Sequence, residues 1–398
     1  MDRAGPRGWD GAWRVDLVYG SALWFTESRV NCHHLTDRLA KERSVLYVES
    51  VGARAPRAHE WRRIVPRLAR SFRPLRQVTP QLWIYSPLPL PAYGRGAEVN
   101  SRWVGRQVAT VLGLKRWSVD ACWVFHPMGL GTAVAAAPRG LIYYCVDDYA
   151  ANPGVDAAAI GRMEGELAKR AGLTITTGEP LAARLRATAR RVEVLPNVAD
   201  TELFGRDFAG VHHPVLDALD TLPRPRLGYL GNLAGYKVDP VLIEDIARLR
   251  PDWTLALVGP TNRGDVRAEV ANRSSPTNVH WLGEVPHGLA PAVIDRFDVA
   301  LLPSARHKVM ESSFPLKFFE YLLRGKPVVA RPVPALRPYA DWLDLAEDAS
   351  GFVAAAERHL GGGAGYSERR RAFAADFGWG QRMKVLRPLR EEVLGSKS

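Results

Sequence analysis

Cysteine is scarce for a chain of this length. The 398 residues include only three cysteines, Cys32, Cys122 and Cys145, and none of them forms a C-x-x-C pair. Their wide spacing argues against a disulfide framework, an iron–sulfur centre and a cysteine zinc site. A chain this long buries enough core without such cross-links, and at roughly 150 residues per domain it is expected to hold two or three domains.

Long hydrophobic runs are also lacking. Ala121–Pro138 carries no formal charge over 18 residues, but His126, two glycines and two prolines interrupt it. These interruptions argue against a membrane-spanning helix. The first residues, MDRAGPRGWDGAWR, lack the apolar region of a secretory signal peptide. We therefore expect a cytoplasmic protein with a globular α/β composition.

Acidic residues are rare in one segment. Arg54–Arg76 contains eight arginines and one acid, Glu60, and its apolar residues follow a helical spacing of three and four. Within it, Trp61–Arg76 is either an ordinary helix with solvated arginines or a basic amphipathic helix in peripheral contact with an anionic membrane. The net charge of +12 does not indicate nucleic-acid binding, because no helix-turn-helix, zinc-finger or RNP-like pattern accompanies it.

Short apolar runs alternate with longer helical patterns along the chain. In the first half, strands are predicted at 14–19, 44–49, 82–85, 121–125, 141–146, 173–176 and 192–195. The same rhythm restarts at Arg226, with strands predicted near 226–230, 254–258, 279–281, 299–302 and 327–330. Such alternation is typical of parallel sheets wound on both faces by helices.

The sequence therefore predicts an α/β protein with two doubly wound, Rossmann-like domains, residues 1–205 and 226–379. Residues 206–225 have no periodicity and are predicted to form a linker, and the last helix, 380–398, is expected to return to the first domain. In open α/β sheets, ligands bind beyond the carboxyl ends of the strands. Two such sheets facing each other would make a cleft, so the loops at these strand ends are the predicted functional sites.

The segment Ser312–Ala330, SSFPLKFFEYLLRGKPVVA, carries the strongest functional signal. Pro315 suits the first turn of a helix, and either of the two serines that open the segment can cap that turn. Free N–H groups around Phe314–Lys317 would then form an anion site suited to a diphosphate. Glu320 follows within reach of a pair of sugar hydroxyls. Alone, the segment is equally compatible with a plain helix and strand whose Glu320 is solvated.

A second segment, Gly228–Lys237, follows the restart strand with the sequence GYLGNLAGYK. The turn at Gly231 lets backbone approach a ligand, and Lys237, six residues later, can neutralise diphosphate oxygens. A glycine turn near a lysine is common. Both segments stand at corresponding strand ends. Together they indicate a nucleotide site more specifically than either segment does alone.

Together these segments resemble the donor domain of GT-B fold, nucleotide-sugar-dependent glycosyltransferases of the family 4-like group, glycosyl transferases group 1. The matching pieces, in order, are LPNVADTELF (195–204), GYLGNLAGYK (228–237), WTLALVGP (253–260), NVHWLGEVP (278–286), FDVALLPS (297–304) and FPLKFFEYLLRGKPVV (314–329). The first half resembles the teichuronic-acid glycosyltransferase branch of this group, through SRVNCHHLTDRLAKERSVLYVES (28–50), LWIYSPLPLP (82–91) and LIYYCVDDY (141–149).

The resemblance implies a donor site in the second domain. Its residues are Gly231, Asn232, Lys237, Pro260, Val285, Ser313, Phe314, Pro315, Leu316, Lys317 and Glu320. It assigns Lys237 to the diphosphate and Glu320 to the ribose hydroxyls, with the base bound by backbone near Glu284–Pro286. Two positions depart from the group: Asn232 stands where it often has arginine, and Ser312 where it has the first acid of a pair.

The first half supplies the predicted catalytic residues, His126 and Asp148. His126 ends an apolar strand where related enzymes often place a histidine near the donor sugar. Asp147 and Asp148 end the next strand, where they could bind an acceptor hydroxyl or act as a base, or could simply cap a helix. Adjacent strand residues point to opposite faces, so no metal site is expected there. Gly20 and Ser21 follow the first strand, where close backbone approach to the cleft would be useful.

The sequence thus predicts transfer of a sugar from a UDP-, GDP- or dTDP-sugar to an acceptor hydroxyl or amine of a natural product or cell-surface glycan. No cofactor or metal is expected beyond this co-substrate. Retention of configuration is favoured, because the inverting branch commonly has a histidine where this chain has Gly20 and Ser21. The alternatives are a nucleotide-sugar epimerase or phosphorylase on the same fold, and a non-catalytic nucleotide-sugar-binding partner subunit, which the departures at Asn232 and Ser312 favour.

Overall fold

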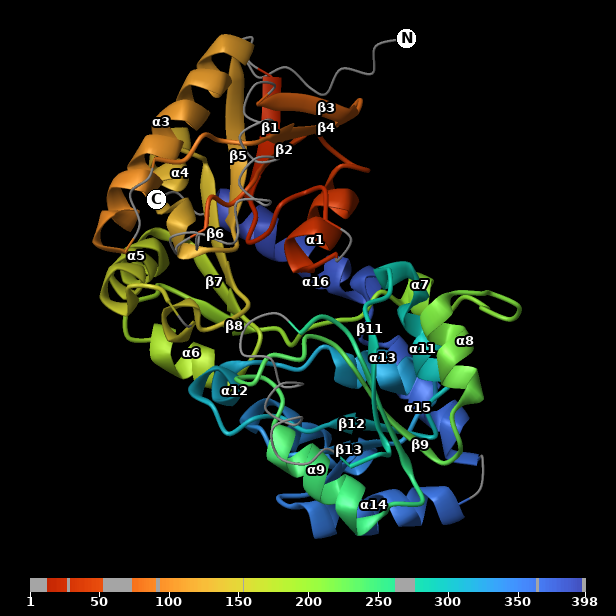
Figure 1. Ribbon diagram of the computed structural model, residues 1–398. Coiled ribbons are helices and arrows are strands. Elements are labelled where there is room, and N and C mark those ends of the chain that lie inside the picture. Colours follow the sequence, from red (N-terminus) through yellow and green to blue (C-terminus); the bar gives the residue numbers. More distant parts are fainter. Residues whose placement is uncertain are drawn as a thin grey trace. The chain divides into compact units, whose positions relative to one another are not determined.

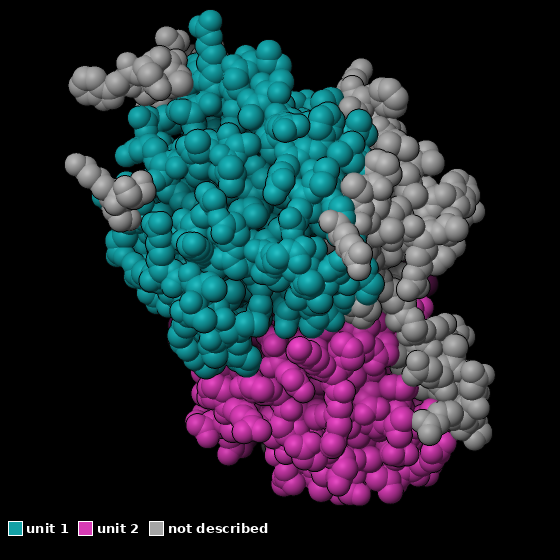
Figure 2. Space-filling model, turned by 90° about the vertical axis from the view of Figure 1, so that its left-hand side faces the viewer, with its two compact units in different colours: residues 1–196, 383–398 teal, residues 197–382 magenta. Residues whose placement is uncertain are grey.

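The computed structural model describes residues 13–26, 29–52, 74–90, 94–152, 154–261, 276–362 and 365–395. The chain divides into two compact units, which Figure 2 distinguishes by colour: unit 1 is Met1–Pro196 with Met383–Ser398, and unit 2 is Asn197–Arg382. Each unit is built on a mainly or wholly parallel sheet with helices packed against it (Figure 1). The predicted pair of doubly wound, Rossmann-like α/β domains is confirmed.

Unit 1 contains an eight-stranded sheet of order β3-β4-β2-β1-β5-β6-β7-β8. Its strands are β1 (Trp13–Tyr19), β2 (Val45–Val48), β3 (Leu75–Thr79), β4 (Leu82–Tyr85), β5 (Trp117–Val124), β6 (Gly140–Cys145), β7 (Leu173–Thr176) and β8 (Val192–Val194). Every residue of β2 and β7 is buried. Strands covered on both faces contain continuous apolar runs, which is why the sequence located them well.

Strand β3 corrects one prediction. The basic segment was interpreted as helical up to Arg76, but Leu75 and Arg76 pair antiparallel with Tyr85 and Ile84 of β4. A sheet edge offers unpaired backbone groups, and pairing with them outweighs a weak helical spacing. Residues 53–73, which include most of the segment considered for membrane contact, lie outside the described residues.

The main helices of unit 1 are α1 (Asn31–Leu39), α3 (Ala97–Lys115), α4 (Leu130–Ala136), α5 (Ala157–Arg170), α6 (Glu179–Leu185) and, from Met383 on, α16 (Trp379–Gly395). The Arg390 guanidinium donates a 2.8 Å hydrogen bond to the buried carboxylate of Asp16 on β1. Val393 fills the space above Gly140 at the start of β6. The C-terminal helix therefore returns to unit 1 and forms part of its core. Among the described residues, no helix is both long and apolar enough to cross a membrane.

Unit 2 contains a six-stranded, all-parallel sheet of order β11-β10-β9-β12-β13-β14. Its strands are β9 (Arg226–Leu230), β10 (Thr254–Val258), β11 (Val279–Gly283), β12 (Val299–Leu302), β13 (Val328–Ala330) and β14 (Asp344–Leu345). Its helices are α7 (Thr201–Phe204), α8 (Pro214–Thr221), α9 (Pro240–Leu249), α11 (Ala290–Asp295), α12 (Lys308–Ser312), α13 (Lys317–Leu323), α14 (Ala349–Gly361) and α15 (Gly365–Ala375).

Hydrophobic clusters cover both faces of this sheet. Leu255 of β10 belongs to the core that includes α9 and α14, and the next residue, Ala256, belongs to the core that includes α8, α11 and α13. Successive strand side chains alternate between faces, so each strand contributes to both cores. This packing fixes the carboxyl ends of β9, β10 and β11 side by side.

The predicted linker, residues 206–225, belongs to unit 2. Its helix α8 buries Val215, Leu216 and Leu219 in the core of that unit. The boundary between the units falls earlier, after Pro196. A helix of eight residues has little more than two turns, which is too short for a hydrophobic period to be recognised in sequence.

Candidate functional site

The carboxyl ends of β9 and β10 meet through two glycines. Gly231 follows β9 and donates its N–H to the carbonyl of Val258, at 2.9 Å. Gly259 follows β10 with a φ of 139°, and a Cβ there would lie 1.9 Å from the carbonyl oxygen of Gly231. These two positions have no room for a side chain, so the backbone itself is accessible to a ligand at these strand ends.

The loop after Gly231 is a compact turn. Asn232 Oδ1 accepts a hydrogen bond from the Ala234 N–H at 3.1 Å, so this side chain shapes its own turn. The Leu233 N–H donates to the carbonyl of Pro260, at 2.8 Å, which ties the turn to the end of β10. The turn delivers Lys237, whose backbone N–H bonds to the Ala234 carbonyl at 2.8 Å.

Lys237 carries a positive charge that the described part of the chain does not neutralise. Its side chain is half-buried, and its ammonium lies 5.9 Å from the ring centre of Tyr236. No carboxylate of the described residues lies within salt-bridge distance of it, although most other cations of unit 2 have such a partner. A partly desolvated, unpaired ammonium is suited to an anionic ligand.

The helix of the FPLKFFEYLL segment begins later than predicted. Ser312 ends α12 and Ser313 is its C-cap, while α13 begins at Lys317 with Leu316 as an N-cap that lacks a side-chain hydrogen bond. The Phe318 N–H bonds to the carbonyl of Pro315, at 3.0 Å. The predicted serine cap is therefore wrong, because α13 begins four residues after Ser313, with Leu316 at the N-cap position.

Side chains before and within α13 are held by the core of unit 2. The ring of Phe314 is buried and stacks on Phe319 with centroids 5.4 Å apart, so only its backbone is available to a ligand. Its carbonyl accepts a 3.1 Å hydrogen bond from Asn197 Nδ2, which fixes the loop before the helix. Asn197 lies in the LPNV motif but was not recognised as a positioning residue.

Glu320 is buried on α13, with 2% of its surface exposed. The Lys317 ammonium forms an ion pair with its Oε2 at 2.7 Å, and no hydrogen bond to that oxygen is found among the described residues. A buried carboxylate with an open acceptor is costly unless a further donor satisfies it. The solvated alternative for Glu320 is therefore wrong, and the carboxylate is suited to accept from a ligand hydroxyl.

Two further contacts complete the donor-side loops. Gly283, at the end of β11, accepts a 2.8 Å hydrogen bond from the Gly259 N–H, and Val285 packs partly buried against the core. The segment expected to bind the base thus follows the strand beside β10. The structure brings the predicted donor residues to adjacent strand ends and to α13 of one unit.

Sequence reasoning missed Arg331, which supports the Lys237 loop. Its buried guanidinium donates to Asp239 Oδ2 at 2.6 Å and to the carbonyl of Ser304 at 2.8 Å. Asp239 caps α9 directly after the loop, and Ser304 pairs with Val238 in an isolated bridge. A charged residue immediately after the apolar run of β13 was the available signal.

In unit 1 the structure gives Gly20 a packing role. A Cβ at Gly20 would lie 1.9 Å from the hydroxyl of Tyr47, so this glycine is required by the tyrosine. This packing accounts for a glycine at position 20, and the expected close approach of its backbone to a ligand stays a prediction. Ser21 follows, with its Oγ 3.7 Å from Cys32 Sγ, at the carboxyl end of β1.

His126 follows β5 and is buried. Its Nδ1 accepts a 3.1 Å hydrogen bond from the Met128 N–H, and burial lowers its pKa to about 4. At neutral pH the imidazole is therefore uncharged, with its proton on Nε2. The ring lies against Tyr149, with centroids 4.3 Å apart. This histidine is better suited to donating a hydrogen bond to a sugar oxygen than to taking up a proton.

Asp147 and Asp148 follow β6, and both carboxylates hold their own turn. Asp148 accepts from the Ala151 N–H at 3.3 Å, and Asp147 accepts from the Asp148 N–H at 3.0 Å. The hydroxyl of Tyr149 donates to the carbonyl of Phe125, at 2.5 Å, and so joins this loop to the end of β5. The structure thus gathers the predicted residues of unit 1 on neighbouring strand ends. Within the described ranges, no three His, Cys, Asp or Glu side chains converge as metal ligands.

The two units define a GT-B fold. Sucrose-phosphate synthase from Thermosynechococcus elongatus has a TM-score of 0.73, with 96% of this chain and 100% of that chain covered at 15% identity. The Anabaena protein HepE, in complex with UDP-glucose, has a TM-score of 0.65, with 96% and 100% covered at 16% identity. Structural similarity at 15–16% sequence identity establishes the fold alone.

Parts of the chain are similar in sequence to known glycosyltransferases. Residues 224–361 match the family of glycosyl transferases group 1. A Bacillus subtilis (strain 168) protein described as a teichuronic acid biosynthesis glycosyltransferase, TuaH, is 30% identical over 203 residues, which are 49% of this chain and 50% of that protein. The 2-deoxystreptamine glucosyltransferase of Streptomyces kanamyceticus is 30% identical over 171 residues, 41% and 42% of the two chains.

The chain spans about half the length of the curated relatives it matches. Its residues 224–361 are similar to group 1 glycosyltransferases, and the chain has the GT-B fold, as the motifs indicated. The matched residues include the loops after β9, β10 and β11 and helix α13.

Proposed function

We propose that the protein transfers a sugar from a nucleoside-diphosphate sugar to a hydroxyl or amine of an acceptor. The observation that carries the proposal is the convergence, within unit 2, of three features: the bare backbone at Gly231 and Gly259, the unpaired ammonium of Lys237 and the buried carboxylate of Glu320. They match the diphosphate and the ribose hydroxyls of a nucleotide sugar in charge and hydrogen-bonding capacity.

The proposed donor roles follow from this chemistry. Lys237 stabilises the charge that develops on the leaving diphosphate, which approaches the glycine backbone where no side chain obstructs it. Glu320 Oε2 accepts from a ribose hydroxyl. A UDP-sugar is the favoured donor, since HepE is described with UDP and glucose, and a structure described as trehalose-6-phosphate from E. coli is described as bound with UDP-2-fluoro glucose. The favoured acceptors are natural products or cell-surface glycans, in line with the names of the two curated relatives.

In the proposed reaction, the bond between the anomeric carbon and the diphosphate oxygen breaks as the acceptor oxygen or nitrogen bonds to that carbon. The acceptor proton leaves with the diphosphate, because the pKa of about 4 makes His126 a poor base and Asp148 is engaged in its turn. Retention follows when the acceptor enters on the face that the diphosphate leaves. No metal is part of the proposal, since Lys237 supplies the cation.

The proposal is tested with purified protein. A thermal-shift panel of UDP-, GDP- and dTDP-sugars identifies the donor, because ligand binding raises the melting temperature. Nucleotide release with a panel of acceptors then measures transfer, and proton NMR of the product gives the anomeric configuration. Donor binding without release would favour a non-catalytic partner subunit, for which the engagement of Asn232 in its own turn is the supporting observation. We further propose a cytoplasmic location, which three buried cysteines without disulfides support.

A further inference from the structure

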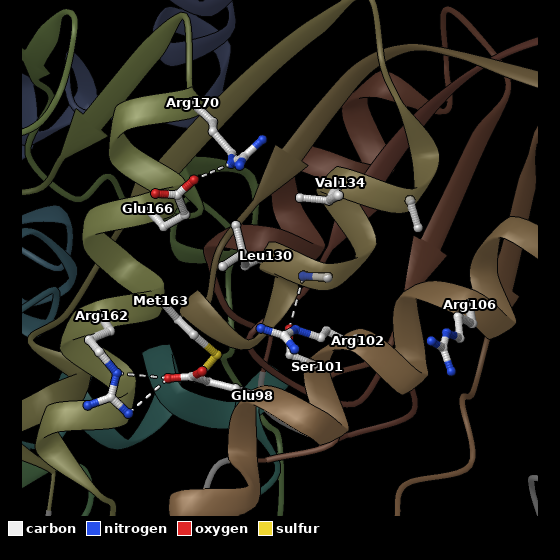
Figure 3. Close-up of a pocket in the computed structure, with 12 residues that line it drawn as sticks. Glu98, Ser101, Arg102, Arg106, Leu130, Val134, Arg162, Met163, Glu166 and Arg170 are labelled. Carbon is white, nitrogen blue, oxygen red and sulfur yellow. Dashed lines mark hydrogen bonds and ion pairs between the residues drawn. The ribbon is translucent and has the colours of Figure 1, made fainter.

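A recess lies between three helices of unit 1, on residues that the proposed transfer reaction does not use. Helix α4 has 7 residues, whereas its neighbours α3 and α5 have 19 and 14. A short helix between two longer ones leaves the space beyond its end unfilled. The resulting pocket has a volume of about 690 Å³, and Figure 3 shows α5 residues on one side, α3 residues on the other and α4 between them.

Close packing of α3 on α4 forms the base of the recess. A Cβ on Gly131 would lie 2.1 Å from the carbonyl oxygen of Ser101, and a Cβ on Gly105 would lie 2.2 Å from the carbonyl oxygen of Gly131. The Gly131 N–H also donates to Ser101 Oγ at 2.9 Å. The two helices are locked together, so the pocket is preformed.

The interior of the pocket is apolar. Its apolar lining residues are Leu130, Val134 and Ala135 from α4 and Met163 from α5. Val134 is 54% exposed, so its side chain is accessible to a ligand in the pocket. These side chains offer an apolar ligand a surface from which water can be displaced.

The rim is charged, and its charges are not balanced. Arg162 pairs with Glu98 at 2.9 Å, and Arg170 pairs with Glu166 at 2.6 Å. Both acids of the lining are therefore already engaged by α5. Arg102 and Arg106 stand one turn apart on α3, exposed, and no carboxylate in the described part of the chain lies within salt-bridge distance of either.

We propose that this pocket binds an amphipathic anion, an aliphatic chain that ends in a phosphate or carboxylate. The chain lies on Leu130, Val134 and Met163, and the head group bonds to Arg102 and Arg106. Guanidinium groups bind phosphate and carboxylate through paired N–H donors, and two of them without a described carboxylate partner make this rim cationic. The volume lies within the roughly 300–1,000 Å³ of small-molecule sites.

Titration calorimetry with dodecyl phosphate below its micelle concentration tests the site. Dodecyl maltoside has a comparable chain without the charge, butyl phosphate has the head group with a short chain, and dodecyltrimethylammonium has the opposite charge. We expect dodecyl phosphate to bind one site at least tenfold more tightly than any of the three. Equal binding of the maltoside or of the ammonium would overturn the proposal, as would the absence of dodecyl phosphate binding.

Matched variants locate the site. Arg102→Gln with Arg106→Gln should weaken dodecyl phosphate at least tenfold, whereas Lys115→Gln with Arg190→Gln, which removes two exposed cations of the same unit outside the lining, should not. Val134→Gln should weaken it about fivefold. Val99→Gln is its control, because Val99 is also 54% exposed and does not line the pocket. All six positions are exposed, so unchanged melting temperatures verify folding. Equal losses in variants and controls would show that the ligand binds elsewhere.

Discussion

The hydroxyl oxygen of Tyr321 accepts a hydrogen bond from the backbone N–H of Leu230, at 2.9 Å. The bond joins the middle of α13 to the last residue of β9, although the two residues are 91 positions apart. Their sequence neighbours, Glu320 and Gly231, are thereby held near each other. Burial raises the pKa of the Tyr321 phenol well above its ordinary value, so the hydroxyl stays protonated. One buried contact thus unites the two strongest motifs.

The first prediction concerns this contact. Tyr321→Phe removes the acceptor and leaves the buried N–H of Leu230 without its partner, which costs about 1–3 kcal/mol of unfolding free energy. Urea denaturation measures the loss. The control is Tyr366→Phe, because Tyr366 is 62% exposed and should lose little. Equal stability of Tyr321→Phe and the unmodified protein would show that the hydroxyl contributes nothing to holding α13.

The second prediction concerns the diphosphate. Lys237→Ala should weaken nucleotide-sugar binding about ten- to a hundredfold, because a charge-assisted contact contributes roughly 1.5–3 kcal/mol. Calorimetry with the best donor of the thermal-shift panel gives the affinity. Lys384→Ala, an exposed lysine on α16, is the matched control and should bind normally. Undiminished affinity in Lys237→Ala would remove this lysine from the donor site.

The third prediction concerns the ribose. Glu320→Gln exchanges a charged acceptor for a weaker, neutral one and leaves Lys317 without its ion-pair partner. Affinity for the ribonucleotide should fall about tenfold or more, whereas affinity for the 2′-deoxy analogue should change much less. Calorimetry with both nucleotides separates the cases. An equal loss for both would mean that Glu320 acts on the structure of α13 instead of on the sugar.

The fourth prediction concerns pH. Burial lowers the pKa of His126 to about 4, below the 6.5 of an unfolded histidine, so between these values the unfolded chain binds a proton that the folded protein does not. Protonation of His126 in the unfolded chain therefore does not reduce the unfolding free energy above pH 6.5, but it reduces this free energy progressively as pH falls from 6.5 to 4. The loss amounts to about 3 kcal/mol at most.

The variant that tests it is His126→Asn, which retains an acceptor for the Met128 N–H. Its unfolding free energy, measured by urea denaturation at several values of pH, should depend less steeply on pH between 4 and 6.5. Part of the slope should remain, because burial also lowers the pKa of His33 to about 4. If the two proteins have the same pH dependence, His126 is not buried in its neutral form.

The fifth prediction concerns metal ions. If Lys237 supplies the cation that stabilises the leaving diphosphate, nucleotide release should continue in excess EDTA at an undiminished rate. Added magnesium should not increase it. Complete loss of turnover in EDTA, restored by magnesium, would contradict the metal-free proposal, and donor binding by calorimetry in EDTA would show which step needs the ion.

Local pattern was sufficient to locate most strands and the order of the motifs. The strands at 173–176, 226–230, 254–258 and 299–302 begin and end where the sequence predicts them, because continuous apolar runs between polar turns mark buried parallel strands. Strand β3 and helix α8 were missed. An edge strand is half-exposed and α8 is short, so neither carries a distinct period.

The residue types of the site were also evident from sequence. A nucleoside diphosphate needs close backbone approach, a positive charge and an acceptor for its ribose hydroxyls. A glycine turn, a lysine and a glutamate at strand and helix ends supply these three features, and the residue types alone indicate them. The predicted serine cap was wrong because Ser313 is the C-cap of the preceding helix, α12, and α13 begins only at Lys317. The sequence pattern did not reveal α12.

Only the tertiary structure decided which groups are free to act. It buried Glu320 beside Lys317, engaged Asp148 in its own turn and filled the space above Gly20 with Tyr47. It also showed Tyr321 and Arg331 holding the donor loops together from distant parts of the chain. Sequence determines hydrophobic pattern and chemical capacity locally. Burial, pairing and pKa depend on residues far apart in the chain, and folding alone brings those into contact.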